Sequence, residues 1–140
     1  MDVGSLDVRR KPTPEGFYKG IVQEVKWNDS PNRGGVFVKK AKVRILILTD
    51  NPNVDESTKG RAAFDNIQWT QAMAWRFGSL YAACNGLYDD DDDLADMTPE
   101  KFEKGIVQKE VYFDVVHKAV PWDDGVPRTM ENLQNYRSVE

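Results

Sequence analysis

A regular alternation of apolar and polar residues runs through residues 36–49 (VFVKKAKVRILILT) and indicates a β-strand. One face of this strand carries the apolar side chains of Ala41, Val43, Ile45 and Ile47. The other face carries the basic side chains of Lys40, Lys42 and Arg44, followed by Leu46 and Leu48. The β-branched content of the segment and the turn-forming residues around it favour a strand over a helix.

Four more segments show a two-residue period and are bounded by turn-forming residues, which predicts four further strands. They are residues 17–27, 61–69, 107–120 and 130–139. In the first of them, one apolar face is expected to consist of Phe17, Ile21, Val25 and Trp27. In residues 107–120, His117 is expected on the inward face, as a satisfied histidine of the core or of the barrel end.

The period lengthens after Trp69, because residues 70–88 place their apolar side chains at roughly helical spacing. Thr70 is the expected N-cap of this helix, and Gly86 is expected to end it. Trp69 and Trp75 are expected in the core, where the helix meets the strands.

The predicted elements follow the order strand, strand, strand, helix, strand, strand, with a second short helix at residues 98–104 before the fourth strand. This is the order of an OB-fold, a five-stranded Greek-key barrel with a helix between strands 3 and 4. A β-sandwich would need about seven strands, and an α/β fold would alternate helices with strands. We therefore predict a mainly β chain with a flexible arm at residues 1–14. Residues 15–140 would form a single OB-fold domain with an acidic insert around residues 89–96.

Composition narrows the class of protein further. The 140 residues are 40% hydrophobic and 30% charged, which is typical of a globular domain and not of a disordered chain. No stretch approaches the roughly 18 apolar residues of a membrane span, and residues 1–16 lack the apolar region of a secretory signal. The single cysteine, Cys84, excludes an internal disulfide and a multi-cysteine metal site. We expect a cytoplasmic protein without a cofactor or a membrane partner.

The formal net charge of −4 conceals an uneven distribution along the chain. Residues 1–49 carry ten basic against five acidic residues, whereas residues 50–100 carry three against eleven. The acidic excess includes five adjacent aspartates, Asp89–Asp93, which we expect to form a solvated loop because they repel one another. Because the electrostatic field of a protein is local, the first third of the chain can still present a basic face.

Several short motifs, taken in their order, resemble the small single-stranded DNA-binding proteins of bacteriophages, a family first grouped as a phage domain of unknown function. The motifs are PEGFYKGIVQEVKW at residues 14–27, Gly34-Gly35 before a long strand, Gly60-Arg61 followed by AFDNI, the helix end Cys84-Asn85-Gly86, and Gly105 before the fourth strand. The resemblance spans Glu15 to Tyr136. It implies an OB-fold, no catalysis, and cooperative or dimeric cover of single-stranded DNA in phage replication or recombination, in the host cytoplasm. Many members end in an acidic tail that recruits partners, whereas the acidic run of this chain is internal.

Single strands are held by cationic grooves that follow the phosphates and by aromatic rings on which bases stack. OB-folds bind them on strands two and three, between the first loop and the loop joining strands four and five. The residues that this placement predicts to contact DNA are Arg33, Phe37, Lys40, Lys42, Arg44, Arg61, Phe64, Tyr112, Trp122 and Arg128. Alternate positions on strand two place cations about 7 Å apart, close to the phosphate spacing of a single strand.

Several of these assignments have a plainer alternative. Lys40, Lys42 and Arg44 could form an ordinary solvated strand face, and core packing is the favoured interpretation of Phe37 and Phe64. The alternatives for the whole chain are an OB-fold protein-interaction module of a phage replication or virion complex and, with less support, a Mg²⁺-dependent nuclease. The nuclease would use strand carboxylates, of which Asp65, Glu110 and Asp114 are the candidates, but they form no D-x-D, H-x-H or E-x-K constellation.

Overall fold

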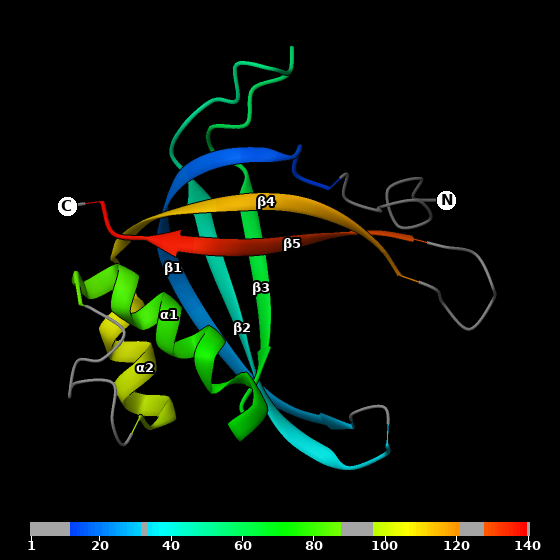
Figure 1. Ribbon diagram of the computed structural model, residues 1–140, viewed down its shortest axis with the longest axis vertical. Coiled ribbons are helices and arrows are strands. Elements are labelled where there is room, and N and C mark those ends of the chain that lie inside the picture. The colour runs from blue at the N-terminus through cyan, green and yellow to red at the C-terminus, as the bar shows by residue number, and fades with distance from the viewer. Residues whose placement is uncertain (1–11, 32–33, 88–96, 121–127, 140) are drawn as a thin grey trace, which may run out of the picture.

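Five antiparallel strands form one sheet in the computed structural model, which describes residues 12–31, 34–87, 97–120 and 128–139. The strand order across the sheet is β3-β2-β1-β4-β5 (Figure 1). The strands are β1 (Gly16–Pro31), β2 (Phe37–Ile47), β3 (Ala62–Gln68), β4 (Glu110–Val120) and β5 (Arg128–Arg137). The predicted mainly β class is confirmed, and each predicted strand is present within a few residues of its expected bounds.

The helical segments lie between β3 and β4, as predicted. They are the 3-10 helix η2 (Gln71–Met73), the helix α1 (Ala74–Asn85) and the helix α2 (Pro99–Ile106). Gly86 ends α1 in the left-handed conformation, with φ 65°, and the Thr98 side chain caps α2 by accepting a hydrogen bond from the Lys101 amide (3.1 Å). The prediction for Thr70 is wrong, because η2 precedes α1 and the Thr70 side chain makes no capping hydrogen bond.

A β-bulge in β1 reverses the face that was expected to point inward at the start of that strand. Tyr18 and Val22 are fully buried, whereas Phe17 is 54% exposed. The register with β2 shifts between Val22 and Glu24, so Gln23 is an extra residue. After the bulge the odd-numbered positions point inward, and Val25 is buried as predicted. The prediction for Phe17 is therefore wrong because the inward side changes from even to odd positions within the strand.

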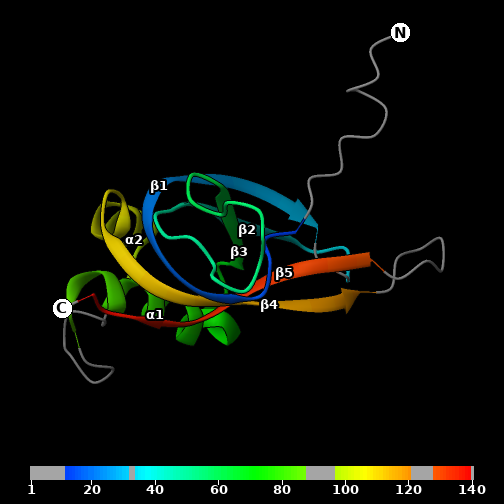
Figure 2. The same ribbon diagram turned by 90° about the horizontal axis from the view of Figure 1, so that it is seen from above.

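The sheet curls around its own apolar face, as the view from above shows (Figure 2). Gly20 permits this close approach, since a Cβ at its position would lie 2.5 Å from the Ile45 side chain of β2. The two edge strands, β3 and β5, are connected by side chains: the Tyr136 hydroxyl donates to the Asp65 carboxylate (2.5 Å). Asp65 is also paired with Arg76 of α1 (2.7 Å), whose guanidinium donates to the Leu133 carbonyl oxygen on β5 (2.9 Å).

An aromatic cluster joins the helices to the sheet. The Trp69 ring stacks on Phe77 of α1 with centroids 4.0 Å apart and meets Trp27 of β1 edge-on at 5.3 Å. Phe102 of α2 completes the cluster and is fully buried. Trp69 is partly buried and packs against the core where the helix meets the strands, which confirms its predicted location at this junction. The prediction for Trp75 is wrong, because this residue lies in the first turn of α1 and is 67% exposed.

The hairpin of β4 and β5 extends beyond the core. Val115 is the last buried residue of β4 among those whose burial is described. His117 follows on the same face of the strand, as predicted, but it is exposed, so the expectation that it could lie in the core is wrong. Its Nε2 instead donates to the Thr13 carbonyl oxygen (2.6 Å). Thr13 is buried and its amide donates to Glu131 of β5 (3.0 Å), so the end of the N-terminal arm is held against this hairpin. The acidic insert around residues 89–96 lies outside the described residues.

Candidate nucleic-acid interface

The outer face of β2 presents the basic residues that the alternation predicted. Ala41, Val43 and Ile45 are fully buried, and this fixes the outward direction of the residues between them. Lys42 and Arg44 are exposed and Lys40 is half-buried, and all three side chains leave the same face of the strand. With Lys26 and Glu24 of β1 and Phe64 of β3, they form what we call the cationic surface.

Phe64 is the aromatic centre of the cationic surface. Its neighbours on β3, Ala63 and Asp65, point inward and are buried, so the Phe64 ring points outward and is half-buried. The Lys42 ammonium lies 4.7 Å from the ring centroid and the Arg44 guanidinium carbon lies 5.8 Å from it. The expectation that Phe64 packs in the core is therefore wrong. These distances are within the range of cation–π contacts.

Two members of the cationic surface were missed by sequence reasoning, and both come from β1. In the register of β1 and β2, Lys26 pairs with Lys42 and Glu24 pairs with Arg44. The signal was the hairpin itself, since counting back from its turn places Lys26 opposite Lys42. A shallow depression of about 150 Å³ is lined by Glu24, Lys26, Lys42, Arg44 and Phe64.

The charges of the cationic surface are not balanced by its own acidic residue. Lys26 and Lys42 stand directly opposite each other, an arrangement that destabilises an antiparallel pair. Glu24 lies 3.7 Å from the Lys26 ammonium, and both side chains are well exposed, so this ion pair is weak. The surface therefore keeps a net positive charge where a phosphate would relieve the repulsion.

Three other predicted DNA contacts lie away from the cationic surface. Phe37 is 70% exposed near the tip of the β1–β2 hairpin, and strand alternation places it on the opposite face from Lys40 and Lys42. Arg61 precedes β3 and lies near Tyr18 at the other end of the sheet. Tyr112 lies on the outer face of β4, where its ring stacks on Phe17 (5.1 Å).

Three further predicted contacts fall at the limits of the described chain. Arg33 and Trp122 lie outside the described residues. Arg128 begins β5 and its backbone pairs with Val120, at the end of the β4–β5 hairpin that is remote from Tyr112. The structure thus brings together four of the ten predicted residues, namely Lys40, Lys42, Arg44 and Phe64.

The carboxylates considered for a nuclease are in separate ion pairs. Asp65 is buried with Arg76, Asp114 pairs with Arg137 (2.9 Å), and Glu110 pairs with Lys19 (3.4 Å). Within the described ranges, no group of three or more His, Cys, Asp or Glu residues could hold a metal ion. Asp65 and Asp114 are also on different sides of the sheet, because Asp65 points into the interior whereas Asp114 lies on the outer face of β4.

Two buried groups near α1 have strongly raised pKa values. Burial raises the pKa of Tyr136 well above its usual value, and the neighbouring Asp65 carboxylate raises it further. Burial also raises the pKa of the Cys84 thiol to about 12. Both side chains are therefore protonated and neutral at physiological pH, and the Cys84 thiol is a poor nucleophile.

Comparison with protein-family models and with curated protein sequences finds no match for this chain. In the part of the chain that the structure describes, no helix is long and apolar enough to cross a membrane. The geometry of the cationic surface and the resemblance of the sequence motifs are therefore the two indications of function.

Proposed function

We propose that this chain is a non-catalytic single-stranded DNA-binding protein built on an OB-type barrel, which coats and protects single strands in phage replication or recombination. The strand order β3-β2-β1-β4-β5 supports the barrel, because an OB barrel has this order and closes between strands 3 and 5. Here the side chains of Asp65, Arg76 and Tyr136 connect those two strands. The sequence motifs support the phage context.

The observation that carries the proposal is the outward Phe64 ring within a cluster of cations that outnumber the single acidic residue of the surface, Glu24. Phe64 lies on the outer face of β3, because its neighbours Ala63 and Asp65 point inward and are buried. Lys42 and Arg44 are held beside its ring, and Lys26 adds a third positive charge from β1. Single-strand binding requires cations and an aromatic ring that faces outward, and the cationic surface has both components.

In the proposed complex, one base stacks on Phe64 while the phosphates on either side of it contact the cations. Lys40, Lys42 and Arg44 are spaced about 7 Å apart along β2, which lets successive phosphates follow the strand. The ring accepts any base, because every base has a π-face, so this contact carries little sequence preference. Recognition of a single strand follows from stacking, since the bases of a duplex are already stacked on one another.

The test is a titration of fluorescein-labelled oligo-dT, followed by anisotropy, with two matched charge reversals. Lys42→Glu introduces a negative charge beside Phe64 and is expected to weaken binding at least tenfold at low salt, because it removes one phosphate contact and repels another. Lys104→Glu, in the last turn of α2, makes the same change in net charge at an exposed position away from β2. It is expected to change the affinity by less than about twofold.

Equal loss of affinity in both variants would show that only the net charge matters and that the cationic surface is not the binding site. Absence of binding by the unmodified protein at low salt would overturn the function itself. The protein-interaction alternative would then gain support. Circular dichroism of both variants checks that each remains folded.

A further inference from the structure

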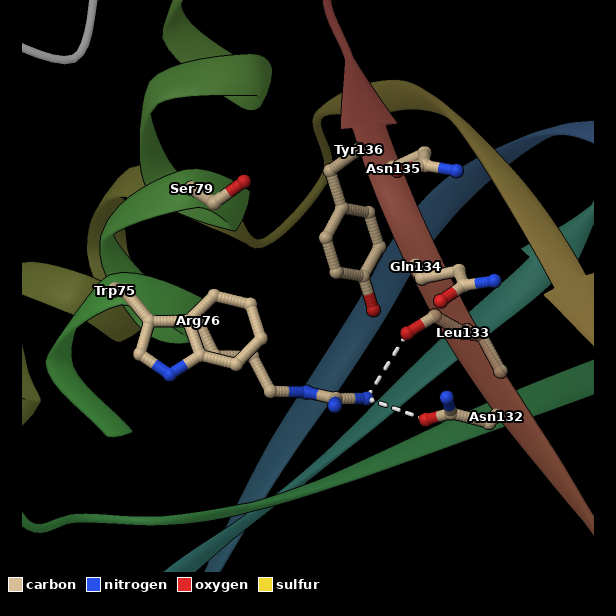
Figure 3. A pocket seen from close by; sticks show the side chains of 8 residues that line it. All are labelled: Trp75, Arg76, Ser79, Asn132, Leu133, Gln134, Asn135 and Tyr136. Carbon is tan, nitrogen blue, oxygen red and sulfur yellow. Dashed lines mark hydrogen bonds between the residues drawn. The ribbon is translucent and has the colours of Figure 1, made fainter. Parts of the chain in front are cut away.

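A second hollow lies between α1 and the C-terminal half of β5 (Figure 3). Its volume is about 230 Å³. Ligand pockets that enclose drug-sized molecules have about 300–1,000 Å³, so this hollow suits a single ring system. It is lined by Trp75, Arg76, Ser79, Asn132, Leu133, Gln134, Asn135 and Tyr136.

The indole ring of Trp75 forms one wall of the hollow, opposite β5 (Figure 3). This side chain is 67% exposed, although α1 buries Phe77 and Leu80 in the core. A large flat ring left in water at the rim of a hollow is a surface on which another ring can stack. Tyr136 closes the upper side of the hollow in the same view.

The one charged residue among the described residues that line the hollow is Arg76, and its charge is already compensated. Its guanidinium binds the Asp65 carboxylate (2.7 Å), the Leu133 carbonyl oxygen (2.9 Å) and the Asn132 side-chain oxygen (3.2 Å). The bond to Asn132 directs the amide oxygen toward Arg76, which leaves the amide NH₂ group of Asn132 as a donor. A phosphate or a carboxylate therefore finds no uncompensated cation here.

The remaining polar groups suit a neutral partner with paired donors and acceptors. Gln134 is exposed and provides an amide with both a donor and an acceptor, and Ser79 adds a hydroxyl from α1. Side-chain amides pair with base edges, as in the two hydrogen bonds between an amide and adenine. A planar heterocycle that stacks on Trp75 would present its edge to β5.

From these contacts we propose that the hollow between α1 and β5 binds a single nucleobase, stacked on Trp75 and hydrogen-bonded along its edge by Asn132 and Gln134. The inference rests on the proposed function, because the base would come from a bound single strand. It adds a base preference that the stacking contact at Phe64 does not provide. The edge contacts, and not the phosphates, set this preference.

The first experiment tests the hollow with nucleosides, which carry no phosphate and do not depend on the cationic surface. Adenosine, guanosine, cytidine and thymidine are titrated into ¹⁵N-labelled protein. We expect one of them to shift the Trp75 indole signal and the Asn132 and Gln134 amide signals saturably. The amide shifts are expected to vanish in Trp75→Ala, a change at an exposed residue that leaves the core intact. Signals that none of the four nucleosides shifts, or amide shifts that persist in Trp75→Ala, would overturn the inference.

The second experiment uses homopolymeric oligonucleotides of the four bases. The oligonucleotide of the base that is preferred as a nucleoside is expected to bind at least about fivefold more tightly than the weakest-binding oligonucleotide. This factor is the lower end of the discrimination that an amide–base pair provides. Trp75→Ala should remove this difference, whereas Lys42→Glu should weaken all four oligonucleotides and preserve their ranking. A ranking that Trp75→Ala leaves unchanged would contradict the base pocket and leave the proposed function standing. Failure of every oligonucleotide to bind would overturn the function, and the nucleoside titration would still decide whether the hollow binds a base.

Discussion

Phe64 and Phe37 are the same residue type on neighbouring strands, yet only one of them lies among the cations. The sequence could place Lys42 and Arg44 of β2, because each lies between two apolar residues in a regular alternation. It could not place Phe64, since an aromatic side chain on a strand fits the core as well as the surface. The register of β3 against β2 pairs Phe64 with Arg44 and so places Phe64 on the surface and not in the core.

This difference between the two phenylalanines is testable. Phe64→Ala is expected to weaken oligo-dT binding by about 1–3 kcal/mol, because base stacking on the ring is lost. Phe37→Ala removes a more exposed ring from the other face of β2 and should leave the affinity unchanged. Anisotropy titrations of both variants measure the effect. A larger loss for Phe37→Ala would move the binding surface to the hairpin tip.

At the scale of elements, β2 was predicted well and β1 only in part. The alternation of β2 is unbroken, whereas β1 changes phase at Gln23. A bulge is visible in a sequence only as this change of phase. The change was hidden here, because Phe17, Ile21 and Val25 form a continuous alternating face that is as apolar as the true inward face. The helix posed a similar difficulty, because the extra turn at η2 moves the start of α1 and leaves Trp75 outside the core.

Two single-residue deletions in β1 test the bulge. Deleting Gln23 removes the extra residue, so that Val22 and Val25 still point inward on a regular strand, and the protein should fold with reduced stability. Deleting Lys26 turns Trp27 away from the aromatic cluster and should abolish cooperative unfolding. Thermal unfolding followed by circular dichroism distinguishes the two. If the variant that lacks Lys26 folded and the variant that lacks Gln23 did not, the register assigned between β1 and β2 would be wrong.

At the scale of the whole molecule, a buried polar network connects the edges of the sheet. Asp65, Arg76 and Tyr136 come from β3, α1 and β5, and no local pattern in the sequence relates them. The Asp65 and Arg76 side chains are only 2% and 16% exposed, so each needs the other to remain charged inside the protein. Sequence reasoning considered Asp65 only as a catalytic candidate, because its partners become visible only in three dimensions.

The network is expected to matter for stability. Asp65→Asn leaves the Arg76 guanidinium without its counter-charge and should lower the free energy of unfolding by about 3 kcal/mol or more. Asp114→Asn breaks a comparable pair with Arg137 at partly exposed positions and should cost less than about 1 kcal/mol. Urea denaturation of both variants gives the comparison. Similar costs would mean that side chains do not hold β3 and β5 together.

The charge of the whole molecule is a weak guide to its partner. The net charge of −4 would ordinarily argue against a nucleic acid, but four cations lie together on one surface of β1 and β2. Long-range repulsion between the acidic remainder and DNA is screened beyond about 10 Å at 0.1 M salt, whereas phosphate contacts at the cationic surface lie within that distance. The proposed binding therefore depends on local contacts, and salt is the variable that reports on them.

The most direct test of the account is the salt dependence of oligo-dT binding by the unmodified protein. Four cations, Lys26, Lys40, Lys42 and Arg44, predict a slope of about −3 for the logarithm of the association constant against the logarithm of salt concentration, because each phosphate neutralised on a single strand contributes about 0.7. A duplex of the same length should bind much more weakly at every salt concentration. A slope near zero, or equal affinity for duplex and single strand, would contradict the proposed single-strand binding surface.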